Sequence, residues 1–277
     1  MPDLRAPLPF LKMHGLGNDF VVIDTRAGGE VPDAALVAAL ADRRRGVGFD
    51  QLAVIHADEG ADLRLEFWNA DGSRSGACGN ATRCIARHEM ARTGKAALAI
   101  ATGGGLLQAR DAGGGLTSVN MGPPRTGWRE IPLARDVDTL ALPIPGDPVA
   151  TSMGNPHCTF FVDDVAAVDL AAFGPAHEHH PLFPERTNVQ VVQVIGPDHL
   201  RMRVWERGAG VTLASGTSSC AVCVAAARRG LTGRKVTLDC DGGRLWVDWR
   251  ADGVWLTGPT MTVFEGRLSA QFLDALR

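Results

Sequence analysis

Residues 69–83 read NADGSRSGACGNATR, and this stretch has a counterpart at residues 206–220, which read ERGAGVTLASGTSSC. An offset of 137 residues aligns the two stretches without a gap and places Cys78 on Ser215. In both copies a loop of small residues ends at a small polar residue, a glycine follows it, and a helical pattern begins there. This corner is the feature around which each half of the chain is organised.

The same offset aligns further features on both sides of the corner. It pairs Gly17 and Asn18 with Gly154 and Asn155, Gln51 with Asn188, Arg64 with Arg201, Trp68 with Trp205, and Asn69 with Glu206. Solenoid repeats are only roughly 20–50 residues long, so this spacing indicates two copies of one domain. Two like domains related by a pseudo-twofold axis are expected to present Cys78 and Ser215 from opposite sides of one cleft. That arrangement suits chemistry on both faces of a single carbon.

The composition is that of a globular protein large enough for two domains. The chain has 277 residues, of which 45% are hydrophobic and 21% are charged, so each half can bury its own core. A net charge of −3, without a block of lysine or arginine, argues against a nucleic-acid partner. The start of the chain lacks the apolar run of a signal peptide, and no segment reaches the roughly 18 apolar residues that cross a membrane. We therefore expect a cytoplasmic protein with no membrane partner, whose six cysteines are reduced thiols.

The order of the expected elements predicts an α+β fold. Apolar patterns predict strands at residues 8–24, 50–56, 62–68, 158–162, 188–195 and 199–205. Helical spacing begins after each corner, at Gly79 and at Thr217, and the first of these helices ends before Gly94. Strands grouped around one helix in each half indicate α+β rather than an alternating α/β sheet. The proline-rich segment at residues 123–148 is expected to start the second domain.

Cys78 lies where a loop becomes a helix, and this position activates its thiol. The backbone N–H groups of Gly79 and Asn80 have no partner within the helix, so they can stabilise a thiolate and bind a carboxylate. A thiolate beside a carboxylate site describes a base held next to the α-carbon of an amino acid. A small buried cysteine is the alternative, and it is the better interpretation for Cys78 considered alone. The repeat favours the catalytic interpretation, because both copies keep a small polar residue and then glycine at this corner.

Several other patterns resemble cofactor or metal sites, but each has a better structural interpretation. Cys220 and Cys223 form a CxxC in an apolar helical run without a second ligand pair, so we interpret them as core residues. Residues 177–180, HEHH, are expected in a solvated loop, and the glycines at 103–105 in a hairpin turn. The chain has three lysines without a Schiff-base context, which argues against pyridoxal phosphate. We therefore expect neither a metal nor a cofactor.

Five motifs resemble the signature set of the diaminopimelate epimerase family and occur in the family's order. They are HGLGNDF at 14–20, NADGS…ACGN…RC at 69–84, SMGNPH at 152–157, NV after FPERT at 183–189, and WERGAG…GT at 205–217. The resemblance covers nearly the whole chain. It implies two pseudo-symmetric diaminopimelate-epimerase-like domains, each with β-strands wrapped around a central helix. It also implies an isomerase that interconverts LL- and meso-diaminopimelate at one α-carbon without pyridoxal phosphate. This reaction belongs to lysine and cell-wall precursor biosynthesis, and its substrate is this small molecule alone. The resemblance further implies a homodimer.

The resemblance also implies roles for individual residues. Cys78 matches one catalytic cysteine, and Ser215 stands at the position of the opposing catalytic group. The matched substrate-binding positions are Asn18, Gln51, Asn69, Gly79, Asn80, Asn155, His157, Asn188, Glu206, Arg207, Gly216 and Thr217. We expect the domain that carries Cys78 to comprise residues 1–122 plus 265–277, and the domain that carries Ser215 to comprise residues 123–264.

Ser215 departs from the family pattern, which has a second catalytic cysteine at this position. A serine alcohol is a far weaker acid than a thiol, and the N-terminus of a helix does not close that gap. Three explanations stay open: an engineered substitution, a natural variant in which Ser215 or a water it holds donates the proton slowly, or another activity. The last would be a one-base lyase or dehydratase, or a binding protein of the same fold. We favour an isomerase whose activity is impaired by Ser215.

Overall fold

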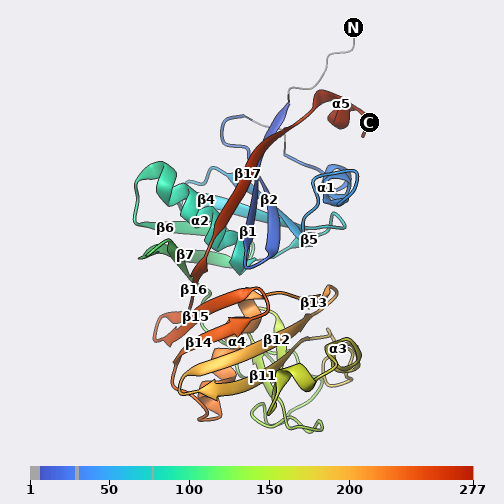
Figure 1. Cartoon of the computed structure of the whole chain (residues 1–277), viewed down its shortest axis with the longest axis vertical. Helices are drawn as coiled ribbons and strands as arrows, with labels where there is room; N and C mark the ends of the chain where they lie inside the picture. The colour runs from blue at the N-terminus through green and yellow to red at the C-terminus, as the bar shows by residue number, and fades with distance from the viewer. Residues whose placement is uncertain (1–6, 29–30, 77, 277) are drawn as a thin grey trace. The chain divides into compact units, whose positions relative to one another are not determined.

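The computed structural model describes residues 7–28, 31–76 and 78–276, and the chain divides into two units. Unit 1 comprises Met1–Thr117 and Pro259–Arg277, and unit 2 comprises Ser118–Gly258 (Figure 1). Each unit has an α+β fold in which helices pack on a mixed sheet. Among the described residues, no helix combines the length and the apolar character needed to cross a membrane.

The described residues of unit 1 form a sheet with seven main strands. They are β1 (Leu8–Gly15), β2 (Asn18–Asp24), β3 (Gln51–His56), β4 (Leu63–Asn69), β6 (Ala97–Thr102), β7 (Gly105–Gly113) and β17 (Met261–Leu268). Their order is β17–β1–β2–β3–β4–β6–β7, and all neighbours are antiparallel except β2–β3 and β4–β6, which are parallel. A short strand that the sequence did not predict, β5 (Arg74–Ser75), pairs with β4.

Unit 2 repeats the part of this arrangement that runs from β1 to β7. Its strands are β9 (Val149–Ser152), β10 (Pro156–Phe161), β11 (Asn188–Gly196), β12 (His199–Glu206), β14 (Lys235–Cys240) and β15 (Gly243–Arg250), with the short β13 (Gly210–Thr212) beside β12. The order is β9–β10–β11–β12–β14–β15, and all neighbours are antiparallel except β10–β11 and β12–β14, which are parallel. The same alternation runs from β1 to β7 in unit 1. The register repeats as well, because Phe20 lies opposite Gln51 and, at the same offset, His157 lies opposite Asn188. The repeat in the sequence is therefore a repeat of the fold.

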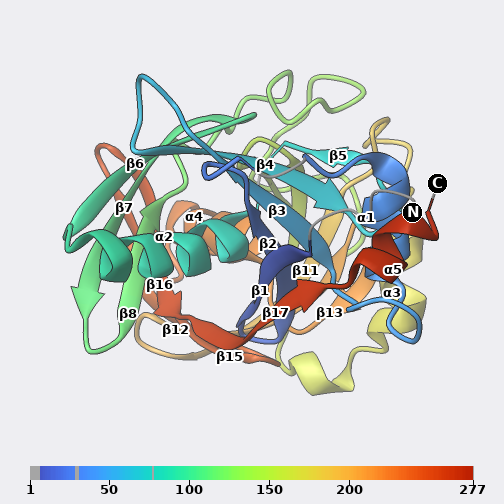
Figure 2. The ribbon, with the colours of Figure 1, turned by 90° about the horizontal axis from the view of Figure 1, so that it is seen from above.

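One long helix lies against the sheet in each unit, as the sequence predicts. α2 (Gly79–Thr93) begins after Cys78 and ends at Gly94, whose left-handed conformation (φ 74°) stops the helix. It packs against β1, β2, β6 and β7, and Figure 2 shows it lying along this face. α4 (Gly216–Arg228) begins after Ser215 and packs against β9, β10, β11, β14 and β15.

Shorter helices cover the opposite face of each sheet. In unit 1, α1 (Ala34–Ala41) and α5 (Ala270–Asp274) share a core cluster with Leu52 and Val54 of β3. In unit 2, α3 (Leu170–Glu178) and the 3-10 helix η1 (Val165–Ala167) share a cluster with Val189 and Val191 of β11, at the same offset. Alternate residues of one strand thus pack on one face, and the remaining residues face the long helix.

The boundaries of the units differ from the expected ones. β17 pairs with β1 along its length, so the chain returns to unit 1 at Pro259 rather than at residue 265. β8 (Leu116–Asn120) pairs with β16 (Gly253–Pro259), and a hydrogen bond of 2.9 Å joins Thr257 to Ser118. The chain therefore enters unit 2 at Ser118 rather than at residue 123. Pairing between distant segments sets both boundaries.

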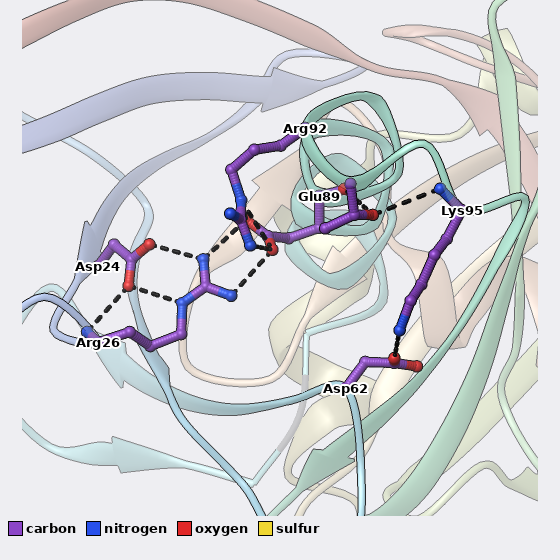
Figure 3. Close-up of polar contacts among 7 residues, drawn as sticks. Asp24, Arg26, Asp62, Glu89, Arg92 and Lys95 are labelled. Atoms are coloured by element: carbon purple, nitrogen blue, oxygen red, sulfur yellow. Dashed lines mark hydrogen bonds and ion pairs between the residues drawn. The ribbon is translucent and has the colours of Figure 1, made fainter.

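A buried ion pair anchors the C-terminal half of α2 to the sheet of unit 1. Glu89 is 2% exposed, and its carboxylate accepts bonds of 2.9 Å from Arg26 and 2.8 Å from Arg92 (Figure 3). Arg26 also pairs with Asp24 at the end of β2, at 2.6 Å. Burial alone raises the pKa of Glu89, but the hydrogen bonds and charges of Arg26 and Arg92 outweigh it and hold that pKa at about 2. The carboxylate is therefore ionised at neutral pH, and it ties the helix that carries Cys78 to β2.

Replacing Glu89 by glutamine is expected to lower the free energy of unfolding by about 2–3 kcal/mol, because it breaks a buried ion pair. Arg26 still pairs with Asp24 in this variant, which limits the loss. Urea denaturation measures this difference. It should be largest above pH 4.5, the ordinary pKa of the carboxyl, and should vanish as the pH falls toward 2. Lys95→Gln is the control, because it breaks the more exposed pair with Asp62 in Figure 3 and should change stability by less than about 1 kcal/mol. Equal effects of the two substitutions would contradict this account.

Candidate functional site

Cys78 occupies the N-cap of α2 in unit 1. Its backbone is extended (φ −145°, ψ 103°), and its Sγ accepts a hydrogen bond from the Ala81 N–H at 3.4 Å. Cys78 is buried, and so are Gly79 and Asn80, the first two residues of the helix. The start of α2 thus directs the Ala81 N–H at the sulfur, which favours negative charge on it.

A chain of hydrogen bonds orients two carboxamides beside this helix N-terminus. Arg83 Nη1 donates to Asn80 Oδ1 at 3.0 Å, and Asn80 Nδ2 donates to Asn18 Oδ1 at 3.1 Å. Asn18 Nδ2 donates in turn to Asp50 at 2.9 Å. Because the Asn18 oxygen already accepts a bond, the remaining N–H of this amide is suited to bind an anion such as a carboxylate.

Gln51 and Asn69 lie opposite each other at the ends of β3 and β4. Gln51 Nε2 donates to Asn69 Oδ1 and to the Ser75 hydroxyl, at 3.3 Å in each case. Asn18 begins β2, which runs parallel to β3 and has Phe20 opposite Gln51. The predicted polar residues of unit 1 therefore gather at one end of its sheet.

Ser215 holds the equivalent N-cap of α4 in unit 2. Its backbone is also extended (φ −133°, ψ 125°), and its side chain is buried. Its hydroxyl makes no capping hydrogen bond to the first turn, although serine is a preferred N-cap residue. The N–H groups at Gly216 and Thr217 are therefore not capped by Ser215, and such groups form an anion site.

In each unit the asparagine of the Gly-Asn pair, Asn18 or Asn155, is hydrogen-bonded to a side chain in the first turn of the long helix. Asn155 Nδ2 donates to Thr217 Oγ1 at 3.4 Å, and the partners are 62 residues apart, as Asn18 and Asn80 are. The direction of the bond differs, because Asn18 accepts whereas Asn155 donates. The structure thus brings together the predicted pair in each unit.

His157 lies fully buried beside Asn155. Its Nε2 is 2.9 Å from Asn155 Oδ1, and its Nδ1 is 3.0 Å from Gln190 Nε2. Burial, and then the charge of Arg207, lowers the pKa of His157 to about 3, so the ring is neutral near pH 7. Gln190 and Ser218, which bond to each other here, are missing from the predicted set. The signal for Gln190 was a polar residue inside an apolar strand, NVQVV.

Asn188, Glu206 and Arg207 lie together at the ends of β11 and β12. Asn188 Nδ2 donates to the carbonyl of Pro156 at 3.0 Å, and its Oδ1 accepts the N–H of Arg207 at 3.0 Å. Glu206 accepts the Thr212 hydroxyl at 2.6 Å. These bonds hold the loop after β12 beside the strand that carries His157, because His157 and Asn188 are paired in register.

Glu178 stabilises the same loop. The expected solvated loop at residues 177–180 is therefore wrong for residues 177 and 178, which end α3, whereas residues 179 and 180 follow the helix and His179 is exposed. Glu178 is the last residue of α3 and is 3% exposed. Its carboxylate accepts the Trp205 indole N–H at 2.6 Å and the Gly208 N–H at 3.0 Å. Packing of α3 on β12 buries the Glu178 carboxylate. Because Trp205 and Gly208 lie on either side of Glu206 in the sequence, the two bonds hold Glu206 in position.

The cysteines other than Cys78 lie inside helices or strands and are poor nucleophiles. Burial raises the pKa of Cys84 to about 11 and the pKa values of Cys223 and Cys240 to about 12. It also raises the pKa of Cys158. Thiols with such values hold almost no thiolate at neutral pH.

Brief treatment with iodoacetamide is therefore expected to label Cys78 first, because the start of α2 stabilises its thiolate. A bound substrate should protect it. Peptide mass spectrometry locates the label, and the early label should be absent in Cys78→Ser. Preferential labelling of Cys223 or Cys240 would contradict the assignment of Cys78.

The chain matches the model of the diaminopimelate epimerase family over residues 10–127 and 149–263. A protein of Rhodospirillum centenum named diaminopimelate epimerase is 53% identical over 271 residues, which cover 95% of this chain and 93% of that protein. Another of the same name, from Phenylobacterium zucineum, is 54% identical over 269 residues, which cover 94% of this chain and 97% of that protein.

Solved structures of lower identity share the fold. A Bacillus anthracis phenazine biosynthesis protein of the PhzF family has a TM-score of 0.67 at 16% identity and covers 95% of this chain and 99% of its own. A probable proline racemase from Agrobacterium radiobacter, with bound carbonate, has a TM-score of 0.69 at 14% identity and covers 95% of this chain and 93% of its own. These two similarities concern the fold alone.

Proposed function

Because the chain belongs to the diaminopimelate epimerase family, we propose that it converts LL-diaminopimelate to meso-diaminopimelate by proton transfer at one α-carbon. The chain is an isomerase of the racemase and epimerase class. The proposed substrate places it in the biosynthesis of lysine and of cell-wall precursors. The observation that carries the proposal is a thiol at the N-cap of a long helix, in one half of a twofold repeat.

In the proposed reaction the Cys78 thiolate removes the α-proton and becomes a thiol, while the C–H electron pair stays on the substrate. The substrate carboxylate shares the resulting charge, and the first-turn N–H groups of α2 and α4 stabilise it. A proton then reaches the opposite face of the carbon from Ser215, or from a water that it holds. Exchange with solvent afterwards removes the proton from Cys78 and returns one to the donor. The bond between Cys78 Sγ and the Ala81 N–H supports the first role, and the matching N-cap position of Ser215 supports the second.

The other predicted residues are assigned to the two amino-acid ends of the substrate. They are Asn18, Gln51, Asn69, Gly79 and Asn80 in unit 1, and Asn155, His157, Asn188, Glu206, Arg207, Gly216 and Thr217 in unit 2. The oriented amides of Asn18 and Asn155 suit carboxylates, because each oxygen is already engaged. Glu206 suits an ammonium group, and Arg207 suits a carboxylate.

Proton NMR in heavy water tests this function. Protein dialysed against a chelator, without added cofactor, should remove the α-proton signal of diaminopimelate and produce the second stereoisomer. Loss of exchange on chelation, restored by a metal ion, would contradict the cofactor-independent mechanism. The lysine-poor sequence without a metal motif motivates this expectation.

A one-base lyase, dehydratase or binding protein is the second candidate, and Ser215 is the observation that favours it. A lyase or dehydratase of this kind needs only the Cys78 base, and a binding protein needs no base. None of the three needs a second thiol. Binding of another amino acid, without any exchange of the α-proton of diaminopimelate, would favour this candidate over the epimerase.

We further propose a homodimer that forms through unit 1, in the cytoplasm. β17 exposes three apolar side chains, Met261, Val263 and Phe264, with exposed fractions of 53%, 53% and 47%, and a partner would shield them from water. Analytical ultracentrifugation should give twice the mass of the chain, and Phe264→Asp should give a monomer because it places a charge on this surface. A monomeric native protein would contradict the dimer. The cytoplasm is proposed because the sequence leads us to expect that the six cysteines are reduced thiols.

A further inference from the structure

Gln190 contacts the ring of His157 inside unit 2, and none of the roles assigned above uses it. Both residues are fully buried, on the neighbouring strands β11 and β10. Gln190 Nε2 lies 3.0 Å from His157 Nδ1 and donates to Ser218 Oγ at 3.0 Å. Gln190 Oε1 accepts the Thr159 hydroxyl at 3.1 Å, which sets the direction of the amide.

The groups around the ring determine which nitrogen of His157 carries the proton. Nδ1 faces the amide N–H of Gln190 and, at 3.5 Å, the hydroxyl of Ser218, so it accepts and is not protonated. Nε2 faces Asn155 Oδ1 at 2.9 Å, which can only accept, so Nε2 carries the hydrogen. The ring is neutral because burial and Arg207 lower its pKa to about 3.

We propose that Gln190 is a positioning residue that, through the tautomer of His157, turns the amide of Asn155 toward a substrate carboxylate. The His157 Nε2–H occupies Asn155 Oδ1, so the Nδ2 group points the other way and donates to Thr217 Oγ1 at 3.4 Å. Its second N–H serves the carboxylate. The opposite tautomer would turn the amide and present its oxygen, which repels a carboxylate. The identity of this ligand rests on the proposed function.

Nitrogen NMR of protein labelled with ¹⁵N-histidine tests the tautomer in the unmodified chain. The chain has eight histidines, and the signals of His157 are those that His157→Gln lacks. We expect a protonated Nε2 and an unprotonated Nδ1. In Gln190→Met, which keeps a long side chain but removes the donor, the Nδ1–H form should become populated. A protonated Nδ1 in the native protein would overturn the proposal whether or not the variant folds.

Substrate binding distinguishes positioning from a general loss of structure. Gln190→Met should raise KM, or the calorimetric Kd, for diaminopimelate about tenfold, which corresponds to about 1.4 kcal/mol for one lost hydrogen bond to a charged group. The kcat should change by less than about threefold, because this bond is equally present in the ground state and the transition state. A partly unfolded variant would instead show a lower kcat at unchanged KM.

Thr151→Val is the matched control. Thr151 lies opposite His157 in the register of β9 and β10, and its buried hydroxyl has no hydrogen-bond partner among the described residues. This control should leave both the tautomer and KM unchanged. An unchanged tautomer and KM in Gln190→Met would overturn the proposal. If the native protein has the expected tautomer but no affinity for diaminopimelate, the positioning of Asn155 is supported and the proposed function alone fails.

Discussion

Replacing Ser215 by cysteine is expected to raise the rate of inversion of diaminopimelate about a hundredfold or more, since a positioned general acid or base contributes about 10²–10⁴-fold. A thiol both gives and takes a proton near neutral pH, whereas a serine alcohol is a far weaker acid. The backbone at Ser215 (φ −133°, ψ 125°) is close to that at Cys78 (φ −145°, ψ 103°), so a cysteine fits this N-cap without strain. Proton NMR of the two stereoisomers measures the rate.

Ser215→Ala is the control for this substitution, because it removes the hydroxyl and keeps the backbone. If the Ser215 hydroxyl donates the proton, the alanine variant should invert diaminopimelate more slowly than the native protein. A native protein that inverts diaminopimelate as fast as the Ser215→Cys form would contradict the expected advantage of a thiol, because serine would then be as competent a proton donor as cysteine.

Replacing Cys78 by serine is expected to slow exchange of the α-proton about a thousandfold, within the range for loss of a positioned base. The loss should not come from unfolding, because serine is a better N-cap than cysteine and should keep α2 in place. Heavy-water exchange measures the rate, and urea denaturation checks the fold.

The Kd for diaminopimelate should change little in Cys78→Ser, because the carboxamides and the helix N–H groups remain. Exchange within about tenfold of the native rate, a difference of only about 1.4 kcal/mol, would place the base on another residue.

The fold was predictable where local patterns are strong. The repeat around Cys78 and Ser215 and the helix between Gly79 and Gly94 are visible in the sequence, because glycines and apolar spacing mark their ends. The pairings of β17 with β1 and of β8 with β16 were not, because pairing between distant segments leaves no trace in local periodicity. The predicted domain boundaries therefore differ from the observed ones.

The site was predictable only in part for the same reason. The Gly-Asn turns and the helix starts stand out as motifs, and the structure joins them in each unit. Gln190 is 33 residues from His157 in sequence and becomes its partner only when β10 and β11 pair. Glu178 falls in a segment that the sequence predicts as a solvated loop, and the packing of α3 buries it. The packing of α2 likewise buries Glu89, which no motif marks.

The central claim is that Cys78 and Ser215 serve opposite faces of one α-carbon and that only Cys78 is a strong base. Separate samples of LL- and meso-diaminopimelate in heavy water, followed by proton NMR, test it most directly. The isomer whose α-hydrogen faces Cys78 should take up deuterium faster than it inverts, and the other isomer should be nearly inert. Equal exchange of both isomers by the native protein would contradict the claim.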